Sequence, residues 1–453
     1  MQTADSTVIT ARDPLPNAMQ TLSRILVLAI PFAFGALITS ALNLGKVALL
    51  ARAPDTGALH ILSLQQPSFI LALAMMEALA ITAQVFSARS RNNWPRRGTL
   101  RAVHRLSLTG IMLFGTVAAA GYAVAQTVPV SDPEISTILT YFPLFILSLV
   151  LYVVFDIYYG ALRGQGKVML GLLPFIGLVA IDLGATYLLV AEFGWGFEAV
   201  LVGNLAGPAL MLPVIAWLLR REMRGGAEDS PDAPFRIRMR QLQIGVGIPV
   251  FSSIMVGFIS AAVVFPLLAK YGEENASAFF VLLRYRIAFM IPAIAIGSAI
   301  AILVNQMAEE GQGRQRLRYL CIGVPTMLFG YGVATFFLPQ WSAPLDLLVP
   351  SQSADLRAAT DAMFAKLLIT FFLVSAAVML QVILEQLGRG VHVLVIIFLV
   401  ESATCAGVVW AATQGAGMTL ILDILIGAAA LSLALFAVQF LILLRKTGSE
   451  HAL

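Results

Sequence analysis

Charged and amide side chains inside long apolar segments are the residues of this chain whose types could do chemistry. Ionisable groups in hydrocarbon are costly, so they usually face the interior of a helix bundle, pair with one another and mark substrate or ion pathways. The members of this set that we consider for function are Lys46, Glu77, Asp182, Asn204, Arg284, Arg286, Lys366, Glu401 and Asp423.

Lys46, Asp182 and Asn204 form the first candidate site. Lys46 lies about four residues inside the outer end of its segment, which is ~6 Å deep at roughly 1.5 Å per helical residue. Asp182 and Asn204 fall about one helical turn deeper on two later segments, within reach of a long Lys side chain. We expect an ammonium–carboxylate pair beside an amide, which a substrate or a proton could open as an ion-coupling site. The alternative is a Lys that extends to the membrane surface and a static structural ion pair.

Glu401 is the second coupling candidate, because it falls in the middle of its segment and is expected to be a protonatable carboxylate. Glu77 is similarly deep, and we count it among the candidates for substrate binding. Asp156 lies nearer the opposite membrane surface, so we expect it to be a structural partner of Arg163 or Lys167.

The cationic candidates of the second half are also expected to contribute to a substrate cleft. Arg284 and Arg286 are two residues apart, which is about 200° around a helix, so the two side chains cannot share a face. Lys366 and Asp423 lie near the outer ends of their segments, where an interfacial position is the alternative.

The elements that carry these residues are long apolar helices. The chain of 453 residues is 59% hydrophobic and 12% charged, whereas a soluble domain has roughly 25% charged residues. About 20 apolar residues cross the hydrocarbon layer as a helix, and the alternating pattern of a membrane barrel is missing. We predict an all-α polytopic membrane protein with twelve spans, near 25–50, 64–88, 106–127, 137–161, 168–191, 196–219, 243–269, 278–306, 319–339, 360–385, 391–412 and 419–444.

Charge predicts the orientation of these spans. Most of the 29 Lys and Arg residues fall in the two tails and in the loops after even-numbered spans. Because Lys and Arg accumulate on the cytoplasmic side, both termini should be cytoplasmic, in a multi-pass protein of the cell inner (plasma) membrane. The basic balance is therefore a topology signal, and we expect the lipid bilayer rather than nucleic acid as partner. The N-terminal region also lacks the pattern of a cleaved signal peptide.

The chain divides into two halves that resemble each other. Leu79–Gln84 resembles Ala301–Gln306, and Leu162–Lys167 resembles Leu384–Arg389, both at a separation of 222 residues. Six spans separate each pair, as in the parallel repeats of secondary transporters. We predict a cytoplasmic tail (1–24), a six-helix bundle (25–219), a cytoplasmic linker (220–242), a second six-helix bundle (243–444) and a cytoplasmic C-terminal tail (445–453).

The order and spacing of these motifs resemble the multidrug and toxic compound extrusion (MATE) family, within the superfamily of multidrug, oligosaccharide-lipid and polysaccharide exporters. The residues that carry this resemblance are Pro31, Ala83-Gln84, Leu162-Arg163 with Gly166, Gly245–Pro249, Tyr271-Gly272, Arg286 and Gln306. The resemblance implies two pseudo-symmetric bundles around a V-shaped cleft, and an antiporter that exports organic compounds using a gradient of H⁺ or Na⁺.

The ion site of the family is altered in this sequence. Lys46 stands where many members carry a cation-binding Asp in span one. The Asn and Asp of span five correspond to Asp182 and Thr186, and the Thr of span six corresponds to Asn204. The resemblance therefore implies that the Lys46 ammonium stands where relatives bind a cation.

We expect a MATE-like antiporter that exports a small organic compound by alternating access, coupled to H⁺ rather than Na⁺ and acting as a monomer. The alternative is a flippase for a lipid-linked oligosaccharide or another amphipathic lipid precursor, whose cavity would also be cationic. An enzyme is not expected, because the four His residues are widely separated and no catalytic motif is present. No cofactor and no metal are expected.

Overall fold

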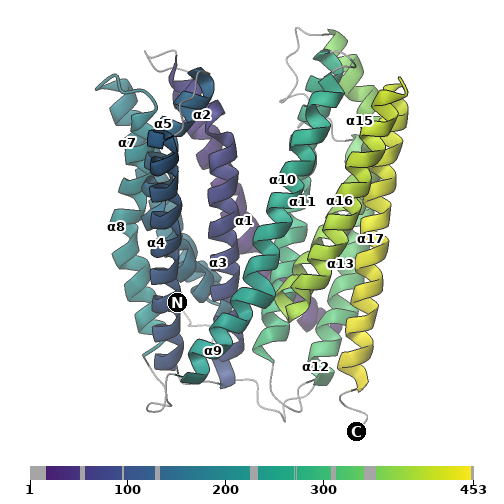
Figure 1. Cartoon of the computed structure of the whole chain (residues 1–453). Helices are drawn as coiled ribbons and strands as arrows, with labels where there is room; N and C mark the ends of the chain where they lie inside the picture. Colours follow the sequence, from purple (N-terminus) through teal and green to yellow (C-terminus); the bar gives the residue numbers. More distant parts are fainter. Residues whose placement is uncertain are drawn as a thin grey trace.

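The computed structural model describes residues 17–50, 57–93, 96–127, 133–224, 233–269, 271, 273–307, 313–340 and 354–449. These residues form long helices that run side by side (Figure 1). The helices of the first half are α1 (Ala18–Leu50), α2 (Ala58–Leu64), α3 (Gln66–Asn93), α4 (Arg96–Thr127), α5 (Pro133–Ser148), α6 (Val150–Gly164), α7 (Val168–Ala191) and α8 (Glu198–Glu222).

The second half continues the same architecture. Its α-helices are α9 (Ala233–Leu242), α10 (Ile248–Ala269), α11 (Glu273–Gln306), α12 (Gly313–Arg318), α13 (Val324–Phe337), α15 (Ala354–Leu384), α16 (Gly390–Thr413) and α17 (Met418–Ser449). Single π-helical turns η1 (Gln243–Gly247), η2 (Tyr319–Gly323) and η4 (Glu385–Arg389) and one 3-10 turn, η3 (Leu338–Gln340), join some of them.

The helices account for the predicted spans. Within the described ranges, 10 segments are long and apolar enough to cross a membrane, and α5 with α6, bent by 42° at their junction, brings the number to 11. One of these segments is the stretch Asp355–Thr413, which is 59 residues long and therefore longer than one crossing needs. It breaks at Gly388, whose φ of +89° leaves the helical region, so α15 and α16 are separate spans. With this division the predicted number of twelve is reached.

The helices gather into two bundles. A large apolar core fills the first bundle between α3, α6, α7 and α8, and separate apolar cores fill the second. The bundles meet through α1 against α11 and through α3 against α10 and α11. They stand close at one end and lean apart toward the other, which is the V shape that the family resemblance implies (Figure 1).

The loop glycines repeat between the halves as the sequence motifs do. The glycines with positive φ in the described residues are Gly166 (+74°), Gly194 (+66°), Gly388 (+89°) and Gly415 (+67°). Gly166 and Gly388 are 222 residues apart, and Gly194 and Gly415 are 221 apart. Only Gly adopts this conformation at no steric cost, so equivalent turns have been placed at equivalent positions of the two halves.

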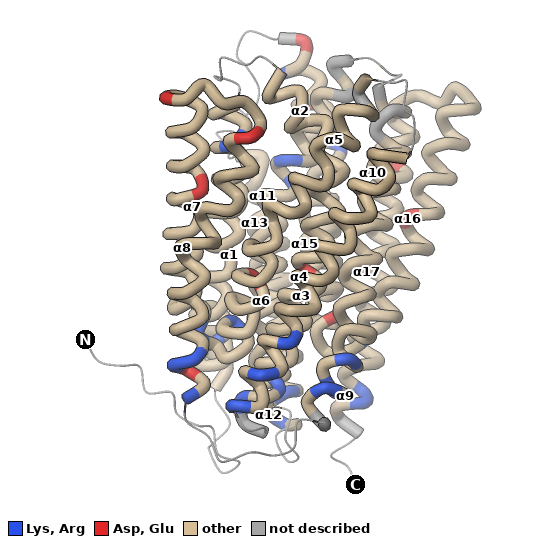
Figure 2. The backbone as a smooth tube through the Cα atoms, turned by 60° about the vertical axis from the view of Figure 1, so that its left-hand side comes forward, with Lys and Arg blue, Asp and Glu red and all other residues tan. Residues whose placement is uncertain are grey.

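Lys and Arg gather at the end where the bundles meet (Figure 2). We call this the basic end and the opposite side the far end. The start of α1 lies at the basic end, where the Arg24 guanidinium donates to the Tyr319 hydroxyl of η2 at 3.3 Å. The end of α17 lies there as well (Figure 1). Both ends of the helical region therefore lie on the same, basic side.

Candidate functional site

The three residues of the first candidate site meet inside the first bundle. The Lys46 ammonium of α1 donates to Asp182 Oδ2 of α7 at 2.7 Å and to Asn204 Oδ1 of α8 at 2.6 Å. Asp182 is fully buried and Lys46 is 7% exposed. Lys46 therefore does not extend to the membrane surface, and the predicted contact of ammonium, carboxylate and amide is present.

Further hydrogen bonds hold this cluster in place. The Asn204 amide nitrogen donates to the Ser148 hydroxyl at the end of α5, at 3.0 Å. The Thr186 hydroxyl donates to the backbone oxygen of Asp182 at 2.9 Å and lies 3.5 Å from its Oδ1 atom. The two acceptors of Lys46 are thus held in place by hydrogen bonds of their own.

Small residues on α8 allow α7 and α8 to approach closely enough for this contact. A Cβ atom on Gly207 would lie 2.6 Å from the Leu178 backbone oxygen, and one on Gly203 would lie 2.5 Å from Asp182 Oδ1. Both glycines face α7, four residues apart, so they form the small-residue interface common between membrane helices. The depth of Asp182 and Asn204 follows from their positions in the sequence, but their separation depends on these glycines.

Lys366 and Asp423 also form an ion pair, in a different setting. Lys366 Nζ of α15 lies 2.8 Å from Asp423 Oδ1 of α17, and it donates to the Thr419 backbone oxygen at 3.0 Å. The side chains are 27% and 54% exposed, respectively. This pair therefore lies at the surface of the second bundle.

Arg284 and Arg286 point in different directions, as their spacing predicts. Arg284 is exposed, and its guanidinium lies over the Phe280 ring at 4.9 Å from the centroid. Arg286 is half-buried, lies 3.4 Å from the Thr370 hydroxyl of α15 and interacts electrostatically with Glu401 of α16. The structure therefore relates Arg286 to the second coupling candidate and leaves Arg284 outside the bundle interior.

Glu77 and Asp156 are both half-buried, on α3 and α6, and their charges interact. Lys167, one of the two partners expected for Asp156, instead pairs with Glu222 at 3.6 Å. Arg163 interacts electrostatically with Asp156, while its guanidinium lies over the Tyr159 ring at 4.8 Å. The sequence analysis missed the relation between Glu77 and Asp156.

A second feature missed from the sequence is a polar contact between the halves at the basic end. The Gln84 amide of α3 donates to Gln386 Oε1 of η4 at 3.0 Å, and the Gln306 amide of α11 donates to the Gly164 backbone oxygen of α6 at 2.8 Å. Gln84 and Gln306 are related by the 222-residue repeat, and so are Gly164 and Gln386. The two contacts are therefore pseudo-symmetric copies of each other.

Two arginines extend this contact. Arg89 Nε donates to Asn305 Oδ1 at 2.9 Å, and Arg91 Nη1 donates to Gln306 Oε1 at 3.0 Å. We call the residues of these four hydrogen bonds the basic-end seam: Gln84, Arg89, Arg91, Gly164, Asn305, Gln306 and Gln386. Their signal in the sequence was the recurrence of Gln84 and Gln306 at the ends of equivalent spans.

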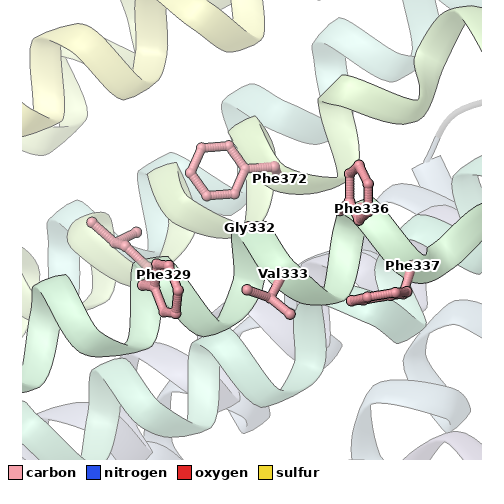
Figure 3. Close-up of a pocket in the computed structure, with 7 residues that line it drawn as sticks. Phe329, Gly332, Val333, Phe336, Phe337 and Phe372 are labelled. Carbon is pink, nitrogen blue, oxygen red and sulfur yellow. The ribbon is translucent and has the colours of Figure 1, made fainter.

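An apolar groove on the second bundle is unrelated to the charged candidates. It lies on α13 and α15 and is lined by Leu328, Phe329, Gly332, Val333, Phe336, Phe337 and Phe372 (Figure 3). Phe329 and Phe336 are 74% and 73% exposed. Exposed aromatic and aliphatic side chains on a membrane helix are typical of a surface that faces lipid.

Comparison with known proteins identifies the fold. No family model and no curated protein sequence matches the chain. A mutant of the Vibrio cholerae MATE transporter VcmN matches over 95% of this chain and 98% of its own, with a TM-score of 0.81 and 13% identity. A multidrug resistance MATE family transporter of the MOP superfamily in an outward-facing conformation matches over 97% and 100%, with a TM-score of 0.78 and 14% identity.

A third solved structure with this fold is a MOP superfamily transporter from Pyrococcus furiosus, described as having a binding pocket of reverse polarity that suggests a different function. It covers 97% of this chain and 99% of its own, with a TM-score of 0.77 and 14% identity. The chain thus has the fold of MATE transporters of the MOP superfamily, as the resemblance of its motifs predicted.

Proposed function

We propose that the protein is a MATE-like secondary active antiporter that exports a small organic compound by alternating access, coupled to H⁺. The observation that carries this proposal is the buried cluster of Lys46, Asp182 and Asn204 inside a bundle of MATE transporter fold. Charged groups are retained in such a position at a cost in desolvation, which favours a functional role.

Lys46 acts in this proposal as a tethered cation. Its ammonium satisfies Asp182 in the resting state, and protonation of Asp182 removes the negative charge that holds it. A zwitterionic substrate opens this pair by placing its cationic group at Asp182 and its anionic group at Lys46. Protonation of Asp182 expels that cationic group, so proton and substrate exclude each other, as antiport requires. Glu401, which interacts with Arg286 in the second bundle, is the other carboxylate that could carry the coupling proton.

Na⁺ is the less suitable coupling ion for this cluster. Na⁺ needs several oxygen ligands, whereas the oxygens of Asp182 and Asn204 already accept hydrogen bonds from an ammonium. The positive charge of Lys46 also repels a second cation at a distance where Coulomb energies are large. A proton needs only one carboxylate, so H⁺ is compatible with these residues.

The substrate is proposed to be zwitterionic or partly anionic. Lys46 stands where the family pattern has an acid, so the first-half site is expected to be less negative than in relatives with that acid. The Pyrococcus furiosus transporter, for which a reverse polarity of the binding pocket suggests a different function, offers a precedent within this fold. Efficient export of lipophilic cations, with no export of zwitterionic or acidic compounds, would count against this assignment.

The basic end is proposed to be the cytoplasmic side of the cell inner membrane, since Lys and Arg are retained there. A monomer contains the complete site, because Lys46, Asp182 and Asn204 come from one chain. We therefore propose a monomeric transporter rather than an enzyme.

Transport by the purified protein in proteoliposomes tests the coupling. A pH gradient imposed without Na⁺ should drive substrate export by the wild type, and Asp182→Asn or Glu401→Gln should abolish the response to the gradient. Glu198→Gln is a suitable control, because Glu198 is exposed and accepts a hydrogen bond from Tyr141. Export driven by Na⁺ alone, or wild-type coupling in both variants, would contradict the mechanism.

The flippase alternative is tested with the same vesicles. Translocation of a lipid-linked oligosaccharide that does not depend on an ion gradient, with no export of soluble compounds, would support the flippase and exclude the antiporter.

A further inference from the structure

Two glycines fix the register of α6 against α3. A Cβ atom on Gly160 would lie 2.5 Å from the Ala80 backbone oxygen, and a Cβ atom on Gly164 would lie 2.9 Å from the Ala88 nitrogen and would also contact the Gln84 backbone oxygen. Along this interface the residue numbers of α6 and those of α3 increase in the same direction, so the two helices are parallel. Residues of α6 therefore lie level with residues about 80 positions earlier on α3.

This register places Asp156 at the level of Glu77. Asp156 precedes Gly160 by four residues, and Glu77 precedes Ala80 by three, so each carboxylate lies one turn before the same contact. Residues three or four apart share a helix face. Glu77 and Asp156 are thus on the facing sides of two closely packed helices, at the same depth.

Glu77 and Asp156 differ from Asp182 in their charged partners. Asp182 has the Lys46 ammonium at 2.7 Å, whereas the largest charge interaction of Asp156 is with another acid, Glu77. The nearby cation is Arg163, two turns along α6, which interacts with Asp156 more weakly than Glu77 does. Asp156 is therefore repelled by Glu77 more strongly than it is attracted by Arg163.

The charged and titratable groups around the pair come from few elements. On α6, Tyr152 interacts with both Asp156 and Asp182, so it lies between the pair and the Lys46 cluster. On α4, the His104 ring forms a hydrogen bond with the Tyr158 hydroxyl at 2.7 Å. On α5, the Tyr141 hydroxyl donates to Glu198. The neighbouring α10, α8 from Ala199 to Leu219 and α11 from Ile287 to Gln306 carry no titratable side chain. The remaining groups that face the pair on α6 and α7 are Tyr159, Arg163 and Asp182.

We propose that Glu77 and Asp156 form a second proton-binding site, in which the two carboxyl groups share one proton. The inference rests on the proposed function in taking H⁺ as the coupling ion, and it adds a proton carrier distinct from Asp182 and Glu401. Two like charges held side by side in a helix bundle cannot both be stable, and one bound proton removes their repulsion. The remaining negative charge is balanced by Arg163. Both side chains are half-buried, so a proton can reach them.

Infrared difference spectroscopy of the purified protein without substrate tests this site directly. The wild type at neutral pH should show the carbonyl band of a protonated carboxylic acid, which disappears when the pH is raised. Glu77→Gln and Asp156→Asn should each remove the band, because the remaining carboxylate loses its like-charged neighbour and ionises next to Arg163. Asp182→Asn should keep the band, since Asp182 belongs to the Lys46 cluster.

Asp156→Glu serves as the conservative variant and should retain a band, which separates loss of the proton site from a general effect on folding. If Asp156→Asn does not give a monodisperse protein, Glu77→Gln alone decides. A full-intensity band in Glu77→Gln, or its loss only in Asp182→Asn, would overturn the proposal.

The infrared spectra and the transport assay test the two proposals independently, so that either proposal can be refuted while the other is retained. Na⁺-driven export with a band that is lost in Glu77→Gln would refute H⁺ antiport and retain the proton site. H⁺-driven export with a band that is unaffected in Glu77→Gln and Asp156→Asn would refute the proton site and retain the antiporter.

Discussion

At the scale of single residues, each partner of the buried Lys46–Asp182 ion pair is destabilising to the protein when the other is missing. Removing one partner of a buried pair leaves an uncompensated charge and costs about 3–5 kcal/mol, whereas replacing both by apolar residues is often neutral or stabilising. We expect Lys46→Met to lower the thermal unfolding midpoint of the detergent-solubilised protein, and Lys46→Met combined with Asp182→Leu to recover most of the loss. Intrinsic tryptophan fluorescence during heating measures both effects.

Lys366→Met is the matched control, because it breaks an ion pair of similar length at the surface. The Lys366 and Asp423 side chains are 27% and 54% exposed, so this substitution should cost less than about 1 kcal/mol. Equal destabilisation by Lys46→Met and Lys366→Met would show that burial does not govern the first pair.

At the scale of elements, the contact between α7 and α8 decides whether the site can form. A Cβ atom on Gly207 would meet the Leu178 backbone oxygen at 2.6 Å, and a backbone atom cannot move away as the end of a side chain can. Gly207→Ala should separate the helices, destabilise the protein by about 1–3 kcal/mol and impair transport. Thermal unfolding and export from proteoliposomes measure the two consequences.

Gly184→Ala on α7 is the control for this substitution. A Cβ atom there would have no neighbour within 4 Å, and Ala is favoured over Gly in a helix by roughly 0.5–1 kcal/mol. Gly184→Ala should therefore leave stability unchanged or raise it. A loss of stability as large as that of Gly207→Ala would mean that helix separation is not the cause.

At the scale of the whole molecule, the basic-end seam holds the two halves together where Lys and Arg gather. Its hydrogen bonds join α3 and α6 to α11 and η4, and the alternating access that we propose requires these contacts to open. We expect a protein with Gln84→Cys and Gln386→Cys, made in a Cys321→Ser, Cys405→Ser background, to lose transport when a short bifunctional thiol reagent joins the halves. A reductively cleavable reagent should allow transport to recover.

The singly substituted proteins, treated in the same way, control for the modification itself and should keep their transport. Full activity of the cross-linked protein would show that the halves do not separate at this end, and it would argue against alternating access through the seam.

Much of the architecture was predictable from local properties of the sequence. The length of an apolar segment determines whether it can span the bilayer, and the placement of Lys and Arg determines its orientation. The same holds for the depth of Lys46, Asp182 and Asn204, whose positions along their helices predicted that they would meet. The equivalence of the two halves was also predictable, because motifs such as those that end at Gln84 and Gln306 recur in the sequence.

For other contacts, the tertiary structure alone decided which side chains became partners. Gln84 and Gln386 are 302 residues apart, and nothing local in either segment selects the other. The level of Asp156 with Glu77 depends on the close approach of α6 to α3 at Gly160, which sets the register of two whole helices. Lys167 likewise pairs with Glu222, at the distant end of α8, rather than with Asp156. Helix depth is encoded along the chain, whereas the rotation and separation of helices are set only when side chains from distant segments pack together.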